Sequence, residues 1–146
     1  MDLDLVRQHA AAANHLAVVA TSRANGSVHA SLVSAGVLDD PISGAASIGV
    51  VVRGDARKLV YLRRSLQATT VFHSGPQWVA VEGPVRLAGP DDESGGISSS
   101  DVPPLLRAIF VAAGGTHEDW AEYDRVMAAD RRVGVLVEAA RITTNR

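Results

Sequence analysis

Cysteine is absent from this chain of 146 residues, so neither a disulfide nor a thiolate metal site can form within it. Aromatic residues make up only 4% of the sequence, and no apolar run approaches the length of a membrane span. The first residues are acidic and lack the basic start and apolar centre of a secretory signal. These absences favour a cytoplasmic protein with no membrane partner.

An excess of either charge is also missing. The formal net charge is −2 at pH 7 and 21% of the residues are charged, which argues against a nucleic-acid-binding protein. Apolar residues make up 47% of the chain. That content and length predict one domain over residues 1–146 that buries its own core.

Sequence motifs of catalysis are missing as well. The chain contains no His-Glu-x-x-His motif, no Gly-x-Ser-x-Gly motif and no phosphate-binding P-loop, and its five histidines show no metal-ligand spacing. We therefore expect no metal site and no catalytic side chain. Two alternatives stay open: an enzyme whose cofactor supplies the chemistry, and a binding protein without activity.

Strand-like runs dominate the pattern that is present. Asn25-Gly26 lies between the first two runs and is typical of a β-hairpin. Gly83 and Pro84 interrupt the fifth run and predict a bend there. Short links favour antiparallel pairing, so we expect an α+β fold with a closed or nearly closed barrel. The six predicted strands are residues 16–21, 28–37, 46–53, 67–73, 77–88 and 132–143.

Helices are expected between these strands and at the barrel ends. Each has a candidate N-terminal cap or a proline in its first turn. The predicted helices are an N-terminal one to about His15 capped by Asp2 or Asp4, one over residues 55–64 capped by Asp55, one over 101–113 with Pro103 and Pro104 near its start, and one over 116–130 with a capping box from Thr116 to Asp119.

A basic segment over residues 54–64 stands out. It holds Lys58, the only lysine beside thirteen arginines. Arg53, Arg57 and Lys58 lie just before or inside the first turn of the predicted helix. A helix N-terminus favours a phosphate, to which lysine adds a point charge and arginine a planar fork. Composition alone favours the alternative, a solvated basic surface helix.

The ordered set of segments resembles the FMN-binding split-barrel family named after pyridoxamine 5'-phosphate oxidase. It is most similar to the actinobacterial branch that uses the deazaflavin coenzyme F420. The segments that carry the resemblance are Asn25-Gly26, Arg57-Lys58, Leu62-Arg63-Arg64, Ala68 to Phe72, Val81-Glu82-Gly83, Val85-Arg86-Leu87, Ala113 to Trp120, Tyr123, Met127 and Arg131-Arg132-Val133.

This resemblance implies a six-stranded, mainly antiparallel split β-barrel with flanking helices. It also implies a homodimer with F420 at the subunit interface, and a reductase that transfers a hydride to a conjugated or heteroaromatic small molecule. FMN is the alternative cofactor, and the rival functions are an FMN-dependent oxidoreductase, a non-catalytic cofactor carrier and a tetrapyrrole-binding relative. The last is disfavoured because no histidine is marked as an axial ligand.

The resemblance also implies a set of cofactor-binding residues. Lys58 matches the family's phosphate lysine. Ala56 occupies a position where many members have arginine, so Arg57, Arg53 or both are expected to substitute. The remaining expected contacts are Ser31, Leu32, Val33 and Ser34 beside the cofactor ring, and Trp78 as an aromatic wall. An ordinary core or interface role for Trp78 is an equal alternative.

Overall fold

A computed structural model describes residues 3–145. Within them the chain forms seven strands, four α-helices and two short 3-10 helices. The strands are β1 (Leu16–Ser22), β2 (Val28–Asp39), β3 (Ala46–Val52), β4 (Gln67–Ser74), β5 (Gln77–Ala88), β6 (Val133–Glu138) and β7 (Arg141–Thr144). The helices are α1 (Leu3–Ala12), α2 (Arg57–Ser65), η1 (Glu93–Gly95), η2 (Ser99–Asp101), α3 (Val102–Ala112) and α4 (Trp120–Ala129).

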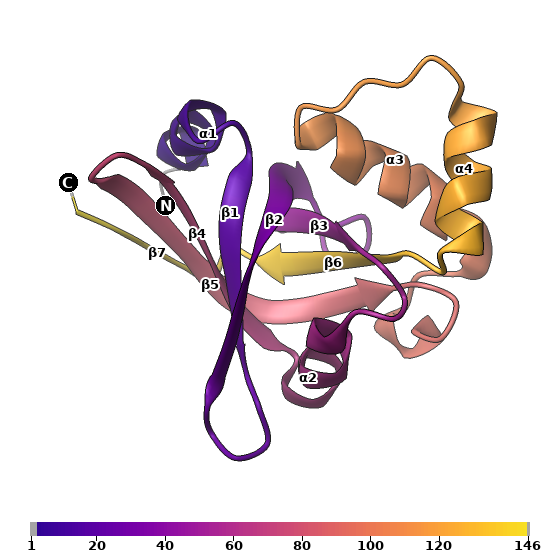
Figure 1. Cartoon of the computed structure of the whole chain (residues 1–146), viewed down its shortest axis with the longest axis horizontal. Coiled ribbons are helices and arrows are strands. Elements are labelled where there is room, and N and C mark those ends of the chain that lie inside the picture. The colour runs from indigo at the N-terminus through magenta and orange to yellow at the C-terminus, as the bar shows by residue number, and fades with distance from the viewer. Residues whose placement is uncertain (1–2, 146) are drawn as a thin grey trace.

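Six of the strands close into a barrel. Their order is β4-β1-β2-β3-β6-β5, and β4 pairs with β5 to complete the ring. Each pairing is antiparallel, and β7 adds an outer strand along β5. Figure 1 shows the strands crossing in two directions, as in a split barrel. The α+β class and the six-stranded antiparallel split barrel expected from the sequence are confirmed.

The hairpin between β1 and β2 forms where Asn25-Gly26 predicts it. The turn is longer than two residues, because Ser22 pairs with Val28. Gly26 has a φ of 86°, a conformation that glycine adopts without strain. The Asn25 side chain accepts the Ser27 backbone N–H at 3.0 Å, which completes the turn.

Two helices fill the ends of the barrel. Val6 and Ala10 of α1, and Leu59 and Leu62 of α2, join the barrel core and are almost completely buried. Figure 1 shows these two helices on opposite sides of the barrel. Each helix therefore contacts the barrel core through a single apolar face, and the basic residues of α2 lie on the face directed away from the core.

The other two helices cover the outside of the barrel. Leu106 and Ile109 of α3 and Tyr123 of α4 form a second apolar cluster with Leu136 of β6. In Figure 1, α3 and α4 lie together at one side of the barrel. No helix in residues 3–145 is long and apolar enough to cross a membrane.

Two predicted helix starts need correction. Helix α2 begins at Arg57 and its cap residue is Ala56, because the Asp55 carboxylate accepts from Arg53 instead of capping. Helix α4 begins at Trp120, since Asp119 rather than Thr116 accepts a first-turn N–H, that of Glu122.

The last strand and the first helix also differ from expectation. The predicted strand 132–143 is divided into β6 and β7, because the Ala140 N–H turns back to the Glu138 carbonyl at 2.8 Å. Helix α1 ends at Ala12 rather than near His15, because Asn14 and His15 take positive φ values that do not continue a right-handed helix. Asp2, one of its two expected caps, lies outside the described residues.

The β5 strand changes partner at the predicted bend. Residues up to Glu82 pair with β7, and residues from Val85 onward pair with β6. At Gly83 a side chain would meet the Glu138 carbonyl oxygen at 2.1 Å, so only glycine lets β6 cross here.

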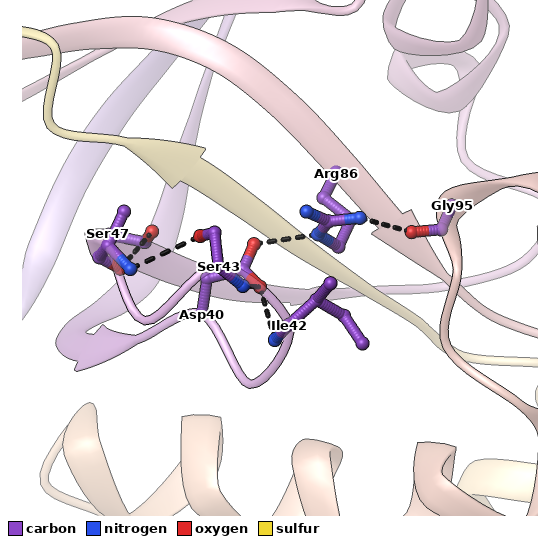
Figure 2. A network of polar contacts seen from close by, with 7 residues as sticks. Asp40, Ile42, Ser43, Ser47, Arg86 and Gly95 are labelled. Atoms are coloured by element: carbon purple, nitrogen blue, oxygen red, sulfur yellow. Dashed lines mark hydrogen bonds and ion pairs between the residues drawn. The ribbon is translucent and has the colours of Figure 1, made fainter.

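A buried ion pair connects the turn after β2 with strand β5 and with η1 (Figure 2). The Asp40 carboxylate, 7% exposed, accepts from Arg86 Nε at 2.7 Å and from the backbone N–H groups of Ile42 and Ser43 at 2.7 and 3.1 Å. Arg86 also donates to the carbonyl of Gly95. Burial raises the pKa of Asp40, but these hydrogen bonds and the Arg86 charge outweigh burial and lower the pKa below its ordinary value.

The Asp40 pair should therefore give the fold an acid-sensitive stability. A carboxylate whose folded-state pKa is lowered stabilises the fold above its unfolded pKa of about 3.9, and this is lost as pH falls through the folded-state pKa. We expect Asp40→Asn to lower the free energy of unfolding by about 2–3 kcal/mol at pH 7 and by much less near pH 3, measured by urea unfolding. The matched control is Asp39→Asn, at an exposed neighbour. Equal losses at both pH values would contradict this role.

Candidate functional site

A cleft of about 460 Å³ opens where the start of α2 meets β2, β3 and the outer helices. We call it the basic cleft, because three cationic side chains line it: Arg53, Lys58 and Arg132. Its remaining lining residues are Leu32, Val33, Ser34, Val51, Val52, Ala56, Ile109, Phe110, Ala113, Tyr123 and Met127. The cleft thus joins a charged end to an apolar and aromatic wall.

Lys58 lies in the first turn of α2 and is half-buried. Within residues 3–145 its ammonium group has no hydrogen-bond or ion-pair partner. Burial lowers the pKa of Lys58, because removal of water disfavours its charged form. An ammonium group that is partly removed from water and has no acidic partner is stabilised when an anion binds beside it.

The start of α2 places backbone N–H donors beside the Lys58 ammonium group. Its cap residue Ala56 supplies no side-chain hydrogen bond, so the first-turn N–H groups are not satisfied by a cap. Arg53 lines the cleft beside Ala56 and makes one long contact, 3.4 Å, with Asp55. Arg57 is exposed and does not line the cleft. Of the two arginines expected to compensate for Ala56, the structure brings only Arg53 to this site.

Strand β2 contributes three of its four predicted residues. Leu32, Val33 and Ser34 line the cleft, and Leu32 and Ser34 belong to the outward-facing row of the strand. Ser31 lies in the inward-facing row opposite Val19, and its buried hydroxyl has no hydrogen-bond partner within the described chain. The alternation of a strand therefore places Ser31 on the opposite face from Leu32 and Ser34, and Val33, which shares the row of Ser31, still lines the cleft.

Trp78 lies away from the basic cleft, near the start of β5. Its backbone N–H donates to the Asn145 side chain at 3.2 Å, and its carbonyl accepts from the Thr144 hydroxyl at 2.8 Å. It lies opposite His73 in the β4–β5 hairpin. Its expected contact with a cofactor stays a prediction that this arrangement does not test.

The outer helices supply wall residues that had no assigned place in a site. Phe110 and Tyr123 lie with ring centroids 5.0 Å apart, and Tyr123 donates its hydroxyl proton to the Leu106 carbonyl at 3.1 Å. Burial raises the pKa of Tyr123, so it remains a neutral donor. Arg132 reaches the cleft from the turn after α4, where the Asp130 carbonyl accepts the Gly54 N–H at 3.2 Å.

A second polar cleft, of about 490 Å³, lies beside Arg63 and Arg86. Its cations are already paired: Arg63 donates to both oxygens of the buried Asp92, at 2.9 and 3.0 Å, and Arg86 donates to Asp40. A charged ligand here would have to break these pairs, whereas the basic cleft offers Lys58 unpaired. No cluster of histidine and acidic residues in residues 3–145 is placed to hold a metal.

The comparisons place this fold among known structures. No protein-family model and no curated protein matches the chain. The conserved hypothetical protein Rv2991 from Mycobacterium tuberculosis is 19% identical over 99% of this chain and 84% of its own, with a TM-score of 0.68. A pyridoxamine 5'-phosphate oxidase-related, FMN binding protein from Nostoc punctiforme is 10% identical over 97% and 82%, with a TM-score of 0.67.

An enzyme complex is also among the similar structures. PhzG from Burkholderia lata, solved with tetrahydrophenazine-1-carboxylic acid, is 14% identical over 97% of this chain and 78% of its own, with a TM-score of 0.55. At these identities the likeness shows the fold alone. The chain therefore has a split barrel of the kind found in proteins related to pyridoxamine 5'-phosphate oxidase.

Glycines on the barrel wall set the depth at which α3 approaches the cleft. At Gly36 of β2 a side chain would meet the Ala112 backbone at 2.3 Å. Gly49 is the register partner of Gly36 on β3, and a side chain there would meet Ile109 at 2.9 Å. The bare backbone at these positions allows α3 to lie directly against the barrel.

Replacing Gly36 should displace the wall of the basic cleft. Gly36→Ala forces a methyl group against the α3 backbone, so we expect the free energy of unfolding to fall by about 1–3 kcal/mol. The measurement is chemical unfolding, with Ala108→Ser on the exposed side of α3 as control. A loss for Gly36→Ala no larger than that of the control would show that α3 does not depend on this contact.

Proposed function

We propose that the basic cleft binds the phosphate end of a flavin-type cofactor and that the protein is a reductase using it. The observation that carries this proposal is the unpaired, half-buried Lys58 at the start of α2, in one cleft with an apolar and aromatic wall. Phosphate is the anion that a helix start and a lysine recognise together. The split-barrel fold supports the proposal, since one similar structure is an FMN binding protein.

Each side of the cleft has a separate task in this proposal. Lys58, Arg53 and the backbone N–H groups of Arg57 and Lys58 hold the phosphate, while Phe110 and Leu32 exclude water beside it. When bound, a reduced deazaflavin or flavin supplies a hydride to an organic acceptor. The chain then needs no acid, base or nucleophile of its own, in agreement with the lack of catalytic motifs.

Coenzyme F420 is our first candidate for the cofactor, and FMN is the alternative. F420 carries a polyglutamate tail in addition to its phosphate, and the chain offers cations beyond those one phosphate needs. Arg132 lines the same cleft as Lys58, and the exposed Arg57 follows the cap residue of α2. FMN is favoured at the level of the fold by the similar FMN binding protein. The acceptor we propose is a conjugated or heteroaromatic small molecule.

We also propose that two copies of the chain pair through the outer face of β2. The residues of this face from Val28 to Ser34 are exposed in strict alternation. Val28 is 62% and Leu32 65% exposed, which is unusual for large apolar side chains on a strand. Leu32 also lines the basic cleft, so a partner seated here would border the cofactor.

Cofactor titration tests the proposed function directly. We expect the purified protein to bind F420 in a titration that is monitored by cofactor fluorescence. Lys58→Ala should weaken the affinity by about 1.5–3 kcal/mol, or about ten- to a hundredfold. Arg53→Ala should act in the same direction because Arg53 lines the same end of the cleft.

One arginine of α2 serves as the control in the titration, and a second is tested for a contribution. Arg64→Ala changes an exposed cation at the far end of α2 and should leave the affinity unchanged. Arg57→Ala decides whether the exposed Arg57 contributes, since its side chain does not line the cleft. Binding of FMN without F420 would select the alternative cofactor, and failure to bind either would refute the proposal. Hydride transfer by the loaded protein to any acceptor would separate a reductase from a carrier.

Pairing through β2 has its own test. We expect wild-type protein to sediment as a dimer and Leu32→Asp to raise the dissociation constant at least about tenfold, because the substitution places two charges in a buried face. Val111→Asp is the matched control, since Val111 is 54% exposed on α3 and is not part of the β2 face. A wild-type monomer, or equal effects of the two substitutions, would argue against this interface.

A further inference from the structure

An apolar pocket of about 170 Å³ lies beside the basic cleft, between α3, α4, the start of η2 and the residues that directly follow β5. We call it the side pocket. Its walls include Val102 and Leu106 of α3 and Met127 and Ala128 of α4, and its charged lining residues are Asp124 and Arg132. Met127 and Arg132 line the basic cleft as well, so the two spaces share one wall.

The size of the side pocket selects a small ring. Engineered cavities of about 150 Å³ with aliphatic and aromatic walls bind benzene, so the side pocket accommodates a single six-membered ring. Val102 and Leu106 are 8% and 3% exposed. Burial of a ring against these dry walls removes the apolar surface of the ring from water.

The two charged groups of the side pocket differ in what they can still bind. Both oxygens of Asp124 are taken by Arg107, through Nε at 2.8 Å and through Nη2. Arg132 donates only to one oxygen of Asp130, from Nε at 3.3 Å and from Nη2 at 3.2 Å. A guanidinium has five N–H donors, so Arg132 retains donors for an anion while the acid is satisfied.

We propose that the side pocket binds a small aromatic carboxylate, with its ring between α3 and α4 and its carboxylate on Arg132. A planar carboxylate matches the guanidinium fork, and the ring lies against the apolar side chains of Val102, Leu106 and Met127. The site is separate from the proposed phosphate end at Lys58, and its occupancy requires no cofactor.

Benzoate is the probe, and the methyl group of Met127 reports binding at the wall that the two spaces share. Only two methionines are present, Met1 and Met127. In protein labelled with carbon-13 at the methionine methyl, we expect benzoate to shift the Met127 signal with a dissociation constant of about 1 mM or tighter. Benzylamine, which has the same ring and the opposite charge, should bind at least tenfold more weakly. No shift at millimolar benzoate, or equal binding of the amine, overturns the proposal.

Substitutions then separate the side pocket from the basic cleft. Ala128→Phe fills the side pocket and should weaken benzoate binding at least tenfold, as should Arg132→Met. Ala129→Phe is the matched control, since Ala129 is exposed on α4 and does not line the pocket. Lys58→Ala should leave benzoate binding unchanged. Retained binding in Ala128→Phe, or loss in Lys58→Ala, would place benzoate in the basic cleft and refute the assignment. If the α4 variants do not fold, the comparison with benzylamine on the wild-type protein still decides.

Discussion

The contact of α3 with bare backbone on the barrel wall determines the rest of the architecture. Gly36 and Gly49 are register partners on β2 and β3, and Gly134 of β6 lies under Ile109 and Leu106. A methyl group at any of the three would meet α3 or a neighbouring side chain at 3.2 Å or less. Because α3 lies at this depth, Phe110 reaches the basic cleft and Leu106 reaches the side pocket. Both sites therefore depend on the same packing.

The parts of the molecule that could be predicted depend on short-range signals. Alternation, an Asn-Gly turn and short links indicated an antiparallel barrel, since each acts within a few residues. Lys58 was identified as a cation at a helix start, and Leu32, Val33 and Ser34 as neighbours of the cofactor. The structure brings these four residues into one cleft. Residue alternation alone could not show that Ser31 faces the interior, because the pairing register of β2 with β1 decides which of its two faces points inward.

The unpredicted parts depend on contacts between distant segments. Arg132 follows Lys58 by more than seventy positions, and it reaches the cleft only because the turn after α4 binds Gly54 through a backbone hydrogen bond. Cap assignments failed for a related reason. Asp55 and Thr116 both fit a capping pattern, yet Asp55 accepts from Arg53 and Asp119 caps α4. Several polar groups competed for the same role, and tertiary geometry chose among them.

Charge pairing explains why composition alone favoured a solvated surface helix for the basic segment. Eight of the thirteen arginines have acidic partners in the described chain: Arg7 with Asp4, Arg53 with Asp55, Arg63 with Asp92, Arg86 with Asp40, Arg107 with Asp124, Arg131 with Asp91, Arg132 with Asp130 and Arg141 with Glu82. These pairs account for a near-neutral chain. Lys58 differs because burial removes water from its ammonium group, and no acid of the described chain pairs with it. A binding site for an anion is therefore indicated by the cation left unpaired after folding rather than by the number of cations in the sequence.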